Sequence, residues 1–382
     1  MKNIKIVITG GGTGGHTSPA ISIINYLKKK SNENLSFDIL YIGSKNGIEK
    51  DYTKKEGIRY LSINTGKLRR SISIKNISDM FKVLIGIFDA RKILSEFKPD
   101  IVFSTGGYVS VPVVLAAKSK NIPLIIHEQT VNVGLANKIA SKVADKVAVT
   151  FESSKEFFPE EKVILTGMPL REEIFEGDKE ECYNLFSLDK SLPLLYITGG
   201  SQGSKFINDT IAVILPELLT EMNIIHQCGG KGIHNSYDEL NDIRDKLSPE
   251  LKTRYVVKDY IYSELKHIFK TADLIVGRSG AGTINECIAL SLPAIYIPLP
   301  GTTRNEQVQN AKLVENIGGA VVLYQQETNP QTLLEQINEL MGDKERLSQM
   351  KEKLKAQESN ANEKIFNLIM KYAKNTTSQK GE

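Results

Sequence analysis

The chain has 382 residues, enough for two domains that each bury a core, and its hydrophobic and charged fractions of 41% and 25% are ordinary for a globular protein. Its net charge of +4 is too small to indicate a nucleic-acid-binding protein. Three scattered cysteines without a C-x-x-C motif favour reduced thiols in a cytoplasmic protein, and no apolar run reaches the roughly 20 residues needed to span a bilayer.

Short apolar runs alternate with longer helical patterns, which predicts an α/β fold of two doubly wound domains with parallel sheets. Gly167 and Pro169 predict a break in regular structure before the second set of apolar runs, so we expect domains over 1–166 and 167–357. The expected strands are 4–9, 36–42, 59–63, 101–104, 123–127, 146–149 and 163–165, then 194–198, 223–228, 254–257, 273–276, 294–297 and 320–323.

Two helical segments have further expectations attached. We expect the helix at 358–374 to pack back on the first domain and the polar tail 375–382 to be disordered. In helix 75–97 a core stripe is expected at Ile77, Met80, Phe81, Leu84 and Phe88, while Val83, Ile85 and Ile87 fall outside it. The helix is either buried more than usual, or it is a membrane-surface patch beside an acid-free basic stretch that includes Lys67, Arg69 and Arg70.

A glycine-rich loop, 10–15, follows the first strand and opens a helix, as in phosphate-binding turns. It meets the G-x-G-x-x-G spacing of dinucleotide enzymes, but the second strand ends in Gly43-Ser44 instead of the acid that binds a ribose. It also fails as a kinase-type loop, because His16 replaces the lysine. We therefore expect His16 to be functional, as an acceptor of a proton or a hydrogen bond.

Two more polar segments end strands of the first half. Gly106, Gly107 and Tyr108 form a second glycine turn, which with the first could bind a diphosphate. His127 and Glu128 end the next strand, where they serve either as hydrogen-bonded loop anchors or in acid–base or acceptor chemistry.

In the second half, a related glycine loop at 199–203 suggests a chain of two similar halves. Segment 278–286 follows a strand and opens a helix, so its amides could hold a diphosphate. Glu286 is either a ribose-binding carboxylate or an acid favoured by the helix dipole on the first turn. Amide side chains in 305–311 could bind sugar hydroxyls.

Six motifs, in order and at matching distances, resemble the MurG family of N-acetylglucosaminyltransferases, which has the GT-B fold of two Rossmann-like domains facing a cleft. They are Gly-Gly-Thr-Gly-Gly-His at 11–16, Thr-Gly-Gly-Tyr at 105–108, His-Glu-Gln at 127–129, Gly-Gly-Ser-Gln-Gly at 199–203, Arg-Ser-Gly-Ala at 278–281 and the segment 307–311.

The resemblance implies transfer of N-acetylglucosamine from UDP-GlcNAc to the C4 hydroxyl of lipid I (undecaprenyl-pyrophosphoryl-MurNAc-pentapeptide), giving lipid II with inversion and without a required metal or cofactor. It also implies peripheral binding to an anionic membrane surface, at the cytoplasmic face of the bacterial cell membrane, through helix 75–97. The expected acceptor-diphosphate site is Gly106, Gly107 and Tyr108.

The resemblance further implies substrate-binding residues. Those of the expected first domain are Thr13, Gly14 and Gly15 near the sugar and acceptor. Those of the expected second domain are Arg171 and Ser201 at the donor, Ile261 at uracil, Ala281, Gly282 and Thr283 at the diphosphate, Glu286 at the ribose and Gln307 at GlcNAc. The chain departs from the family where Asn commonly follows His-Glu-Gln: it has Thr130, with Asn132 two residues later, so either could contact the donor.

The expected mechanism is direct displacement at the anomeric carbon, with His16 or Glu128 as the base and UDP leaving toward 280–286. The alternatives are a diacylglycerol glucosyltransferase or a UDP-GlcNAc 2-epimerase of the same fold, and a nucleotide-sugar-binding scaffold without activity.

Overall fold

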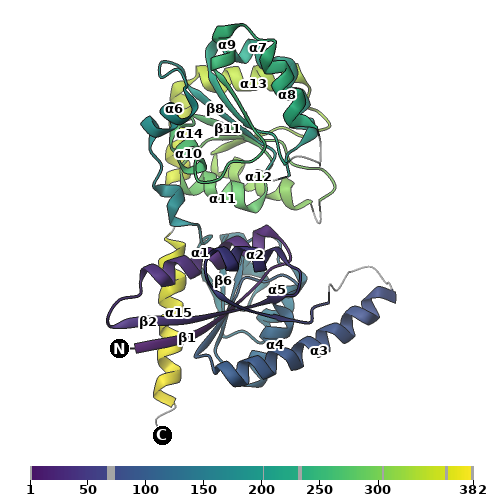
Figure 1. Cartoon of the computed structure of the whole chain (residues 1–382), viewed down its shortest axis with the longest axis vertical. Helices are drawn as coiled ribbons and strands as arrows, with labels where there is room; N and C mark the ends of the chain where they lie inside the picture. The colour runs from purple at the N-terminus through teal and green to yellow at the C-terminus, as the bar shows by residue number, and fades with distance from the viewer. Residues whose placement is uncertain are drawn as a thin grey trace. The chain divides into compact units, whose positions relative to one another are not determined.

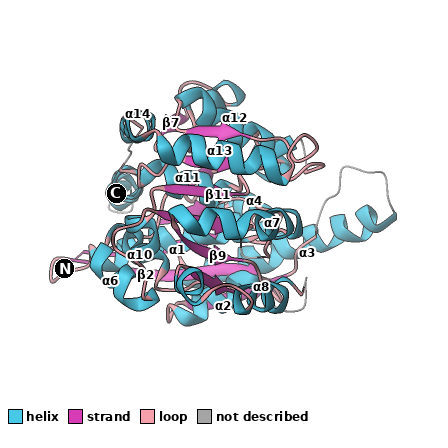
Figure 2. Cartoon of the chain, turned by 90° about the horizontal axis from the view of Figure 1, so that it is seen from above, coloured by secondary structure: helices cyan, strands magenta, loops and turns pink. Residues whose placement is uncertain are grey.

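The computed structural model describes residues 2–66, 74–200, 202–230, 235–302, 305–357 and 360–379, without the side chains of 74–78 and 374–379. The chain forms two compact units, one made of residues 1–171 with 359–382 and the other of residues 172–358. Each unit has a parallel sheet between layers of helices, drawn in magenta and cyan in Figure 2. The predicted class of two doubly wound α/β domains is confirmed.

The first unit has a seven-stranded sheet with the order β3-β2-β1-β4-β5-β6-β7. Its strands are β1 (Lys2–Thr9), β2 (Leu35–Ser44), β3 (Arg59–Ile63), β4 (Ile101–Ser104), β5 (Leu124–Glu128), β6 (Lys146–Val149) and β7 (Val163–Leu165). Its helices are α1 (Gly14–Lys29), α2 (Ile48–Lys55), α3 (Ile74–Phe97), α4 (Val111–Ser119), α5 (Leu135–Ser141), the 3-10 helix η1 (Glu152–Phe157) and α15 (Ala361–Gln379).

The second unit has a six-stranded sheet with the order β10-β9-β8-β11-β12-β13. Its strands are β8 (Leu194–Thr198), β9 (Asn223–Gln227), β10 (Tyr255–Lys258), β11 (Leu274–Gly277), β12 (Ala294–Tyr296) and β13 (Ala320–Val322). Its helices are η2 (Glu172–Phe175), α6 (Lys179–Phe186), α7 (Lys205–Glu221), α8 (Ser236–Asp245), α9 (Pro249–Thr253), α10 (Leu265–Thr271), α11 (Ala281–Ala289), α12 (Glu306–Ile317), α13 (Pro330–Gly342) and α14 (Lys344–Lys355).

All the expected strands are present, and each observed end lies within two residues of its expected position. The reason is the burial of both sheet faces. Along β1, Val7 packs into the core under α3 and α4, while Ile6 and Ile8 pack on the opposite face under α1 and α15. A parallel strand covered in this way must be apolar at nearly every position, which makes it recognisable in the sequence.

Helix α15 returns to the first unit, where it lies beside α1 (Figure 1). Ile365 and Ile369 are fully buried in the same core as β1, and the Phe366 ring makes edge-on contacts with Tyr26 and Phe37. The helix continues to Gln379, so the expectation of a disordered tail is wrong for 375–379; residues 380–382 lie outside the described part.

The expected core stripe of α3 is wrong. Met80, Phe81, Leu84 and Phe88 are between 48% and 71% exposed, and the expected stripe residue Ile77 has no described side chain. The buried face instead carries Val83, Gly86 and Ala90.

Small residues decide which face of α3 is buried. A Cβ at Gly86 would lie 2.0 Å from the backbone oxygen of Asn64 and 3.2 Å from Pro112, so only glycine lets the helix approach this closely. The bulkier apolar residues of α3 therefore remain on the outside. Of the off-stripe residues, Ile87 is half-buried and Ile85 is exposed.

None of the described helices is both long enough and apolar enough to cross a bilayer. Cys182, Cys228 and Cys287 are buried free thiols.

Candidate functional site

In the first unit the expected polar segments lie at one edge of the sheet. Strands β1, β4 and β5 are neighbours, and β1 and β4 form the point where the strand order reverses, a common ligand position in such folds. The loop after β1 meets the loop after β4 directly, because the Gly11 N–H donates to the Gly106 oxygen at 3.3 Å. A Cβ at Gly107, whose φ is +81°, would lie 2.2 Å from the Gly11 oxygen, so this contact requires glycine.

His16, at the start of α1, is partly exposed and bonded to both neighbouring strand ends. Its Nδ1 lies 3.0 Å from the Thr105 oxygen and 2.9 Å from Gln129 Oε1. The Thr105 hydroxyl donates to the His16 backbone oxygen at 2.6 Å. Both ring hydrogen bonds hold His16 through Nδ1, so the opposite side of the partly exposed ring remains available to a substrate.

His127, on β5, is fully buried behind Gln129. Its Nε2 lies 3.0 Å from the Gly167 oxygen and its Nδ1 lies 3.2 Å from Gln129 Nε2. Burial lowers the pKa of His127 to about 4, so the ring is neutral at pH 7. His127 thus supports the site from the interior.

The Glu128 carboxylate is buried and accepts four hydrogen bonds. Oε1 accepts from the N–H and the hydroxyl of Thr130 at 3.1 and 2.8 Å, and Oε2 accepts from the Gly134 N–H at 3.2 Å and the Asn137 amide at 3.0 Å. This is the geometry of a loop anchor. The Thr130 hydroxyl also lies 2.8 Å from the Asn132 oxygen, so the departure from the family motif is part of this anchored turn.

Glu49, a fully buried residue of α2, is part of this site although it belongs to none of the expected motifs. Its carboxylate accepts from the Ser44 N–H at 2.9 Å, the Ser44 hydroxyl at 2.6 Å and the Gly12 N–H at 3.3 Å. Burial, and after it the charge of Glu49, raises the pKa of Tyr108. An internal carboxylate therefore holds the first glycine loop, which makes the loop less suited to a phosphate than its spacing indicates. In the sequence, the only indication of this role is the position of Glu49 shortly after Gly47, in the first turn of α2.

The remaining candidates of the first unit differ in accessibility. Thr13, Gly14, Gly15 and Arg171 are exposed. Gly106 and Gly107 are buried, and the Gly106 N–H donates to the Ser104 hydroxyl at 3.2 Å. Of the expected acceptor-diphosphate segment, Tyr108 is the half-buried member and therefore the one most accessible to a ligand.

In the second unit, β8 and β11 are the neighbours at which the strand order reverses. The loop after β8 contains Ser201, which lies outside the described residues. Gln227, at the end of β9, donates to the Gly200 oxygen at 3.2 Å and accepts from the Ile261 N–H at 3.0 Å. A contact between uracil and the Ile261 backbone would therefore use its carbonyl group.

Helix α11 begins at Ala281, after Gly280 at its N-cap. Gly280 and Gly282 have open space where a Cβ would stand, so the amides at this end can be approached closely. Glu286 is the sixth residue of the helix and lies on the second turn, which corrects the expectation that it lies on the first. Because the dipole effect fades within the first turn, it explains Glu286 poorly, and the ribose-binding interpretation gains support.

Arg278 and Gln307 also have internal partners. The Arg278 guanidinium donates to the Ile297 oxygen at 2.8 Å and to Gln325 Oε1 at 2.7 Å, and burial lowers its pKa to about 10. Gln307 Oε1 accepts from the Leu299 N–H at 2.9 Å, and the Gln307 backbone oxygen accepts from the Ser279 hydroxyl at 2.7 Å. A sugar contact at Gln307 would therefore use its side-chain N–H groups as donors.

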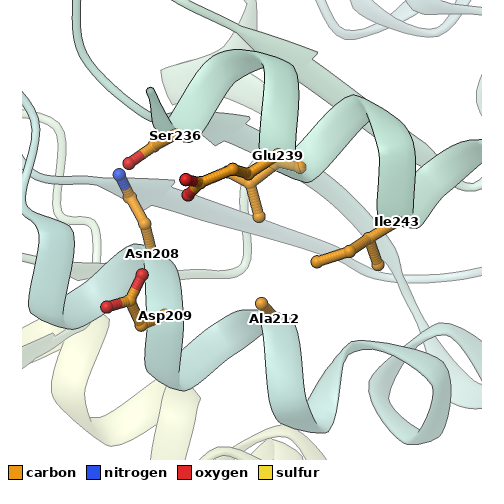
Figure 3. Close-up of a pocket in the computed structure, with 7 residues that line it drawn as sticks. Asn208, Asp209, Ala212, Ser236, Glu239 and Ile243 are labelled. Atoms are coloured by element: carbon orange, nitrogen blue, oxygen red, sulfur yellow. The ribbon is translucent and has the colours of Figure 1, made fainter. Parts of the chain in front are cut away.

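A pocket of about 200 Å³ lies elsewhere, between α7 and α8 (Figure 3). Asn208, Asp209 and Ala212 line it from α7, and Ser236, Glu239, Leu240 and Ile243 line it from α8. None of the expected site residues is among them, so this pocket is separate from the strand-end sites.

Comparison with known proteins gives the family. The model of the glycosyltransferase family 28 N-terminal domain matches residues 6–149, and that of the family 28 C-terminal domain matches residues 194–365. A Clostridium perfringens protein named UDP-N-acetylglucosamine--N-acetylmuramyl-(pentapeptide) pyrophosphoryl-undecaprenol N-acetylglucosamine transferase is 44% identical over 353 residues, which are 92% of this chain and 94% of that protein.

Solved structures agree with this assignment. The crystal structure of Acinetobacter baumannii MurG has a TM-score of 0.75 at 26% identity and covers 96% of this chain and 99% of that one. A Neisseria meningitidis UDP-GlcNAc 2-epimerase, with a TM-score of 0.70 at 16% identity over 97% of this chain and 100% of that one, shares the fold. With both domain models matched and a close relative along nearly its whole length, the chain belongs to glycosyltransferase family 28.

Proposed function

We propose that this protein is the N-acetylglucosaminyltransferase that moves GlcNAc from UDP-GlcNAc to the C4 hydroxyl of MurNAc in lipid I, forming lipid II for peptidoglycan synthesis. The observation that carries the proposal is 44% identity to a relative of that name over 92% of the chain. The epimerase-like alternative has only a shared fold in its favour.

His16 acts as the base in this proposal. It is partly exposed, and its Nδ1 is held by Thr105 and Gln129, which leaves Nε2 to take the proton from the acceptor hydroxyl. Glu128 anchors the turn that follows β5, because four donors already engage its carboxylate.

The second unit holds the donor in this proposal. The N-terminus of α11, at Ala281, Gly282 and Thr283, stabilises the charge that develops on the leaving diphosphate, and Glu286 binds the ribose. Ile261 and Gln307 contribute the uracil and sugar contacts, and Ser201 contacts the donor. Arg171, which belongs to the first unit, is the remaining expected donor contact.

We also propose that α3 binds an anionic membrane surface, where the lipid-linked acceptor is found. Met80, Phe81, Leu84, Ile85 and Phe88 expose apolar side chains along one helix, and Lys82, Arg91 and Lys92 are exposed beside them. This combination suits the interface between acyl chains and anionic head groups. The cations Lys67, Arg69 and Arg70 belong to the same proposal but lie outside the described residues.

Vesicle sedimentation tests the membrane proposal. The double variant Phe81→Ser/Phe88→Ser removes two exposed rings and should lose most binding to vesicles that contain phosphatidylglycerol. The control is Val213→Ser in the second unit, where the valine is 67% exposed, and it should bind as the parent does. Equal binding by the parent and the double variant would rule out α3 as the contact.

A product assay tests the activity. The protein is incubated with labelled UDP-GlcNAc and a lipid I analogue, and in parallel with UDP-GlcNAc alone and with UDP-glucose plus diacylglycerol. A GlcNAc–MurNAc disaccharide on the lipid supports the proposal. Free ManNAc would identify an epimerase, glucolipid a glucosyltransferase, and tight UDP binding without turnover a scaffold.

A further inference from the structure

We propose that Gln129 is a positioning residue that fixes the proton of His16 on Nδ1 and thereby keeps Nε2 as the proton acceptor. The role of His16 as base rests on the proposed function, whereas the position of its proton follows from the contacts of this site alone.

The orientation of the Gln129 side chain is set by its surroundings. The side chain is 1% exposed, and one terminal atom of its amide lies 2.7 Å from the Thr105 oxygen and 3.1 Å from the His127 oxygen. Both neighbours are carbonyl acceptors, so this terminal atom must be the nitrogen, whichever way the amide is first placed. The other terminal atom, Oε1, therefore faces His16 Nδ1 at 2.9 Å.

His16 Nδ1 consequently faces two acceptors, Gln129 Oε1 and the Thr105 oxygen at 3.0 Å. Only a protonated Nδ1 satisfies both of them. The other tautomer would direct the Nδ1 lone pair at two oxygen atoms and lose both hydrogen bonds. In the neutral ring the remaining lone pair is then on Nε2, away from these partners.

His127 has the opposite arrangement and supports the orientation of Gln129. Its Nε2 faces the Gly167 oxygen at 3.0 Å and must be protonated, so its Nδ1 accepts from Gln129 Nε2 at 3.2 Å. The low pKa of the buried His127 ring keeps this lone pair available at neutral pH. One glutamine amide thus joins two histidines whose protons are on different nitrogens.

Nuclear magnetic resonance of ring-15N-histidine protein, recorded at pH 8.5, tests the proton positions without any substrate. We expect the Nδ1–H pattern for His16 and the Nε2–H pattern for His127, with each signal assigned from its loss in His16→Gln and His127→Gln. An Nε2–H pattern for His16 in the parent protein would overturn the proposal, and this measurement depends on no Gln129 variant.

Gln129→Met keeps the shape of the side chain and removes its hydrogen bonds. We expect a new Nε2–H population at His16 and about 10²-fold lower turnover, with little change in KM for UDP-GlcNAc. The control is Gln331→Met, at an exposed position of α13, which should change neither measurement.

A Gln129→Met protein that keeps both the Nδ1–H tautomer and full turnover would refute the positioning role. A parent protein with the expected tautomers but no transferase activity would instead refute the proposed function and leave the positioning role intact.

Discussion

The two units place a glycine-rich loop after equivalent strands, β1 and β8, yet they use the sheet edge differently. In the first unit the edge holds three buried side chains, Glu49, Gln129 and Glu128, each of which hydrogen-bonds its own internal partners. In the second unit, Gly200, Gly280 and Gly282 have open space where a Cβ would stand, as Gly14 also has at the start of α1 in the first unit. The first edge therefore combines an open helix start with buried side chains, among them Gln129, which hydrogen-bonds to His16, whereas the second exposes backbone amides at the start of α11.

This difference shows that a glycine-rich motif predicts an unusual backbone conformation or a close approach, but does not by itself predict that a ligand binds there. Gly107 is needed so that two loops of the same unit can meet, because a Cβ would lie 2.2 Å from the Gly11 oxygen. Gly282, in contrast, leaves the start of α11 uncovered. Substitutions can therefore alter the strand-end site of one unit without altering that of the other.

His16→Ala should have the largest effect. Loss of a general base lowers kcat by about 10²–10⁴-fold, while KM for UDP-GlcNAc should change little, because the proposed donor site is in the second unit. Steady-state kinetics with a lipid I analogue measures both parameters. The control is His267→Ala in α10, which should keep full turnover. Unchanged turnover in His16→Ala would remove His16 from the mechanism.

Acidification should weaken both units, since each contains a buried neutral histidine. Burial lowers the pKa of His127 to about 4 and that of His226 to about 3, below the value of about 6.5 in an unfolded chain. The unfolded state therefore binds more protons below pH 6.5, and stability falls as the pH falls. Between pH 7.5 and pH 5, each histidine should remove about 2 kcal/mol of unfolding free energy.

Urea denaturation at the two pH values measures this loss. His226→Gln should show a smaller loss than the parent, because its buried side chain no longer takes up a proton on unfolding. An equal loss in both proteins would contradict the assignment of this pH dependence to His226.

Glu49→Gln tests the internal organisation of the first loop. Weakening the three hydrogen bonds to the carboxylate should lower the unfolding free energy by about 1–3 kcal/mol. Because the charge of Glu49 helps to raise the pKa of Tyr108, that pKa should fall, as followed by NMR of ring-13C-tyrosine protein. Asp51→Asn, an exposed change in the same helix, is the control. A Tyr108 pKa that stays the same in Glu49→Gln would contradict the contribution of the Glu49 charge to that pKa.

Two glycine changes give the smallest effects and the most direct contrast. Gly107→Ala forces a side chain into a left-handed conformation against the Gly11 oxygen and should cost at least about 1–2 kcal/mol. Gly282→Ala lies in open space within a helix and should raise the unfolding free energy by about 0.5–1 kcal/mol. Denaturation without ligand measures both. Equal losses of unfolding free energy in the two variants would contradict the difference between the sheet edges of the two units.

The strands and the strand ends that carry the polar segments can be predicted from the amino-acid sequence alone. These features are local, because a strand buried on both faces must be apolar along its length and a sharp turn needs glycine. His16 was identifiable for the same reason, as an ionisable residue in a glycine turn.

Which partners these residues have depends on the tertiary structure. His16 and Gln129 are 113 positions apart and Gly12 and Glu49 are 37 apart, so no local pattern relates them. The buried face of α3 was decided in the same way, because the helix is apolar on several sides and the approach of Gly86 to Asn64 selects one of them. Hydrogen bonds and close packing between distant segments depend on how the chain folds back on itself, and periodicity in the sequence contains no information about that.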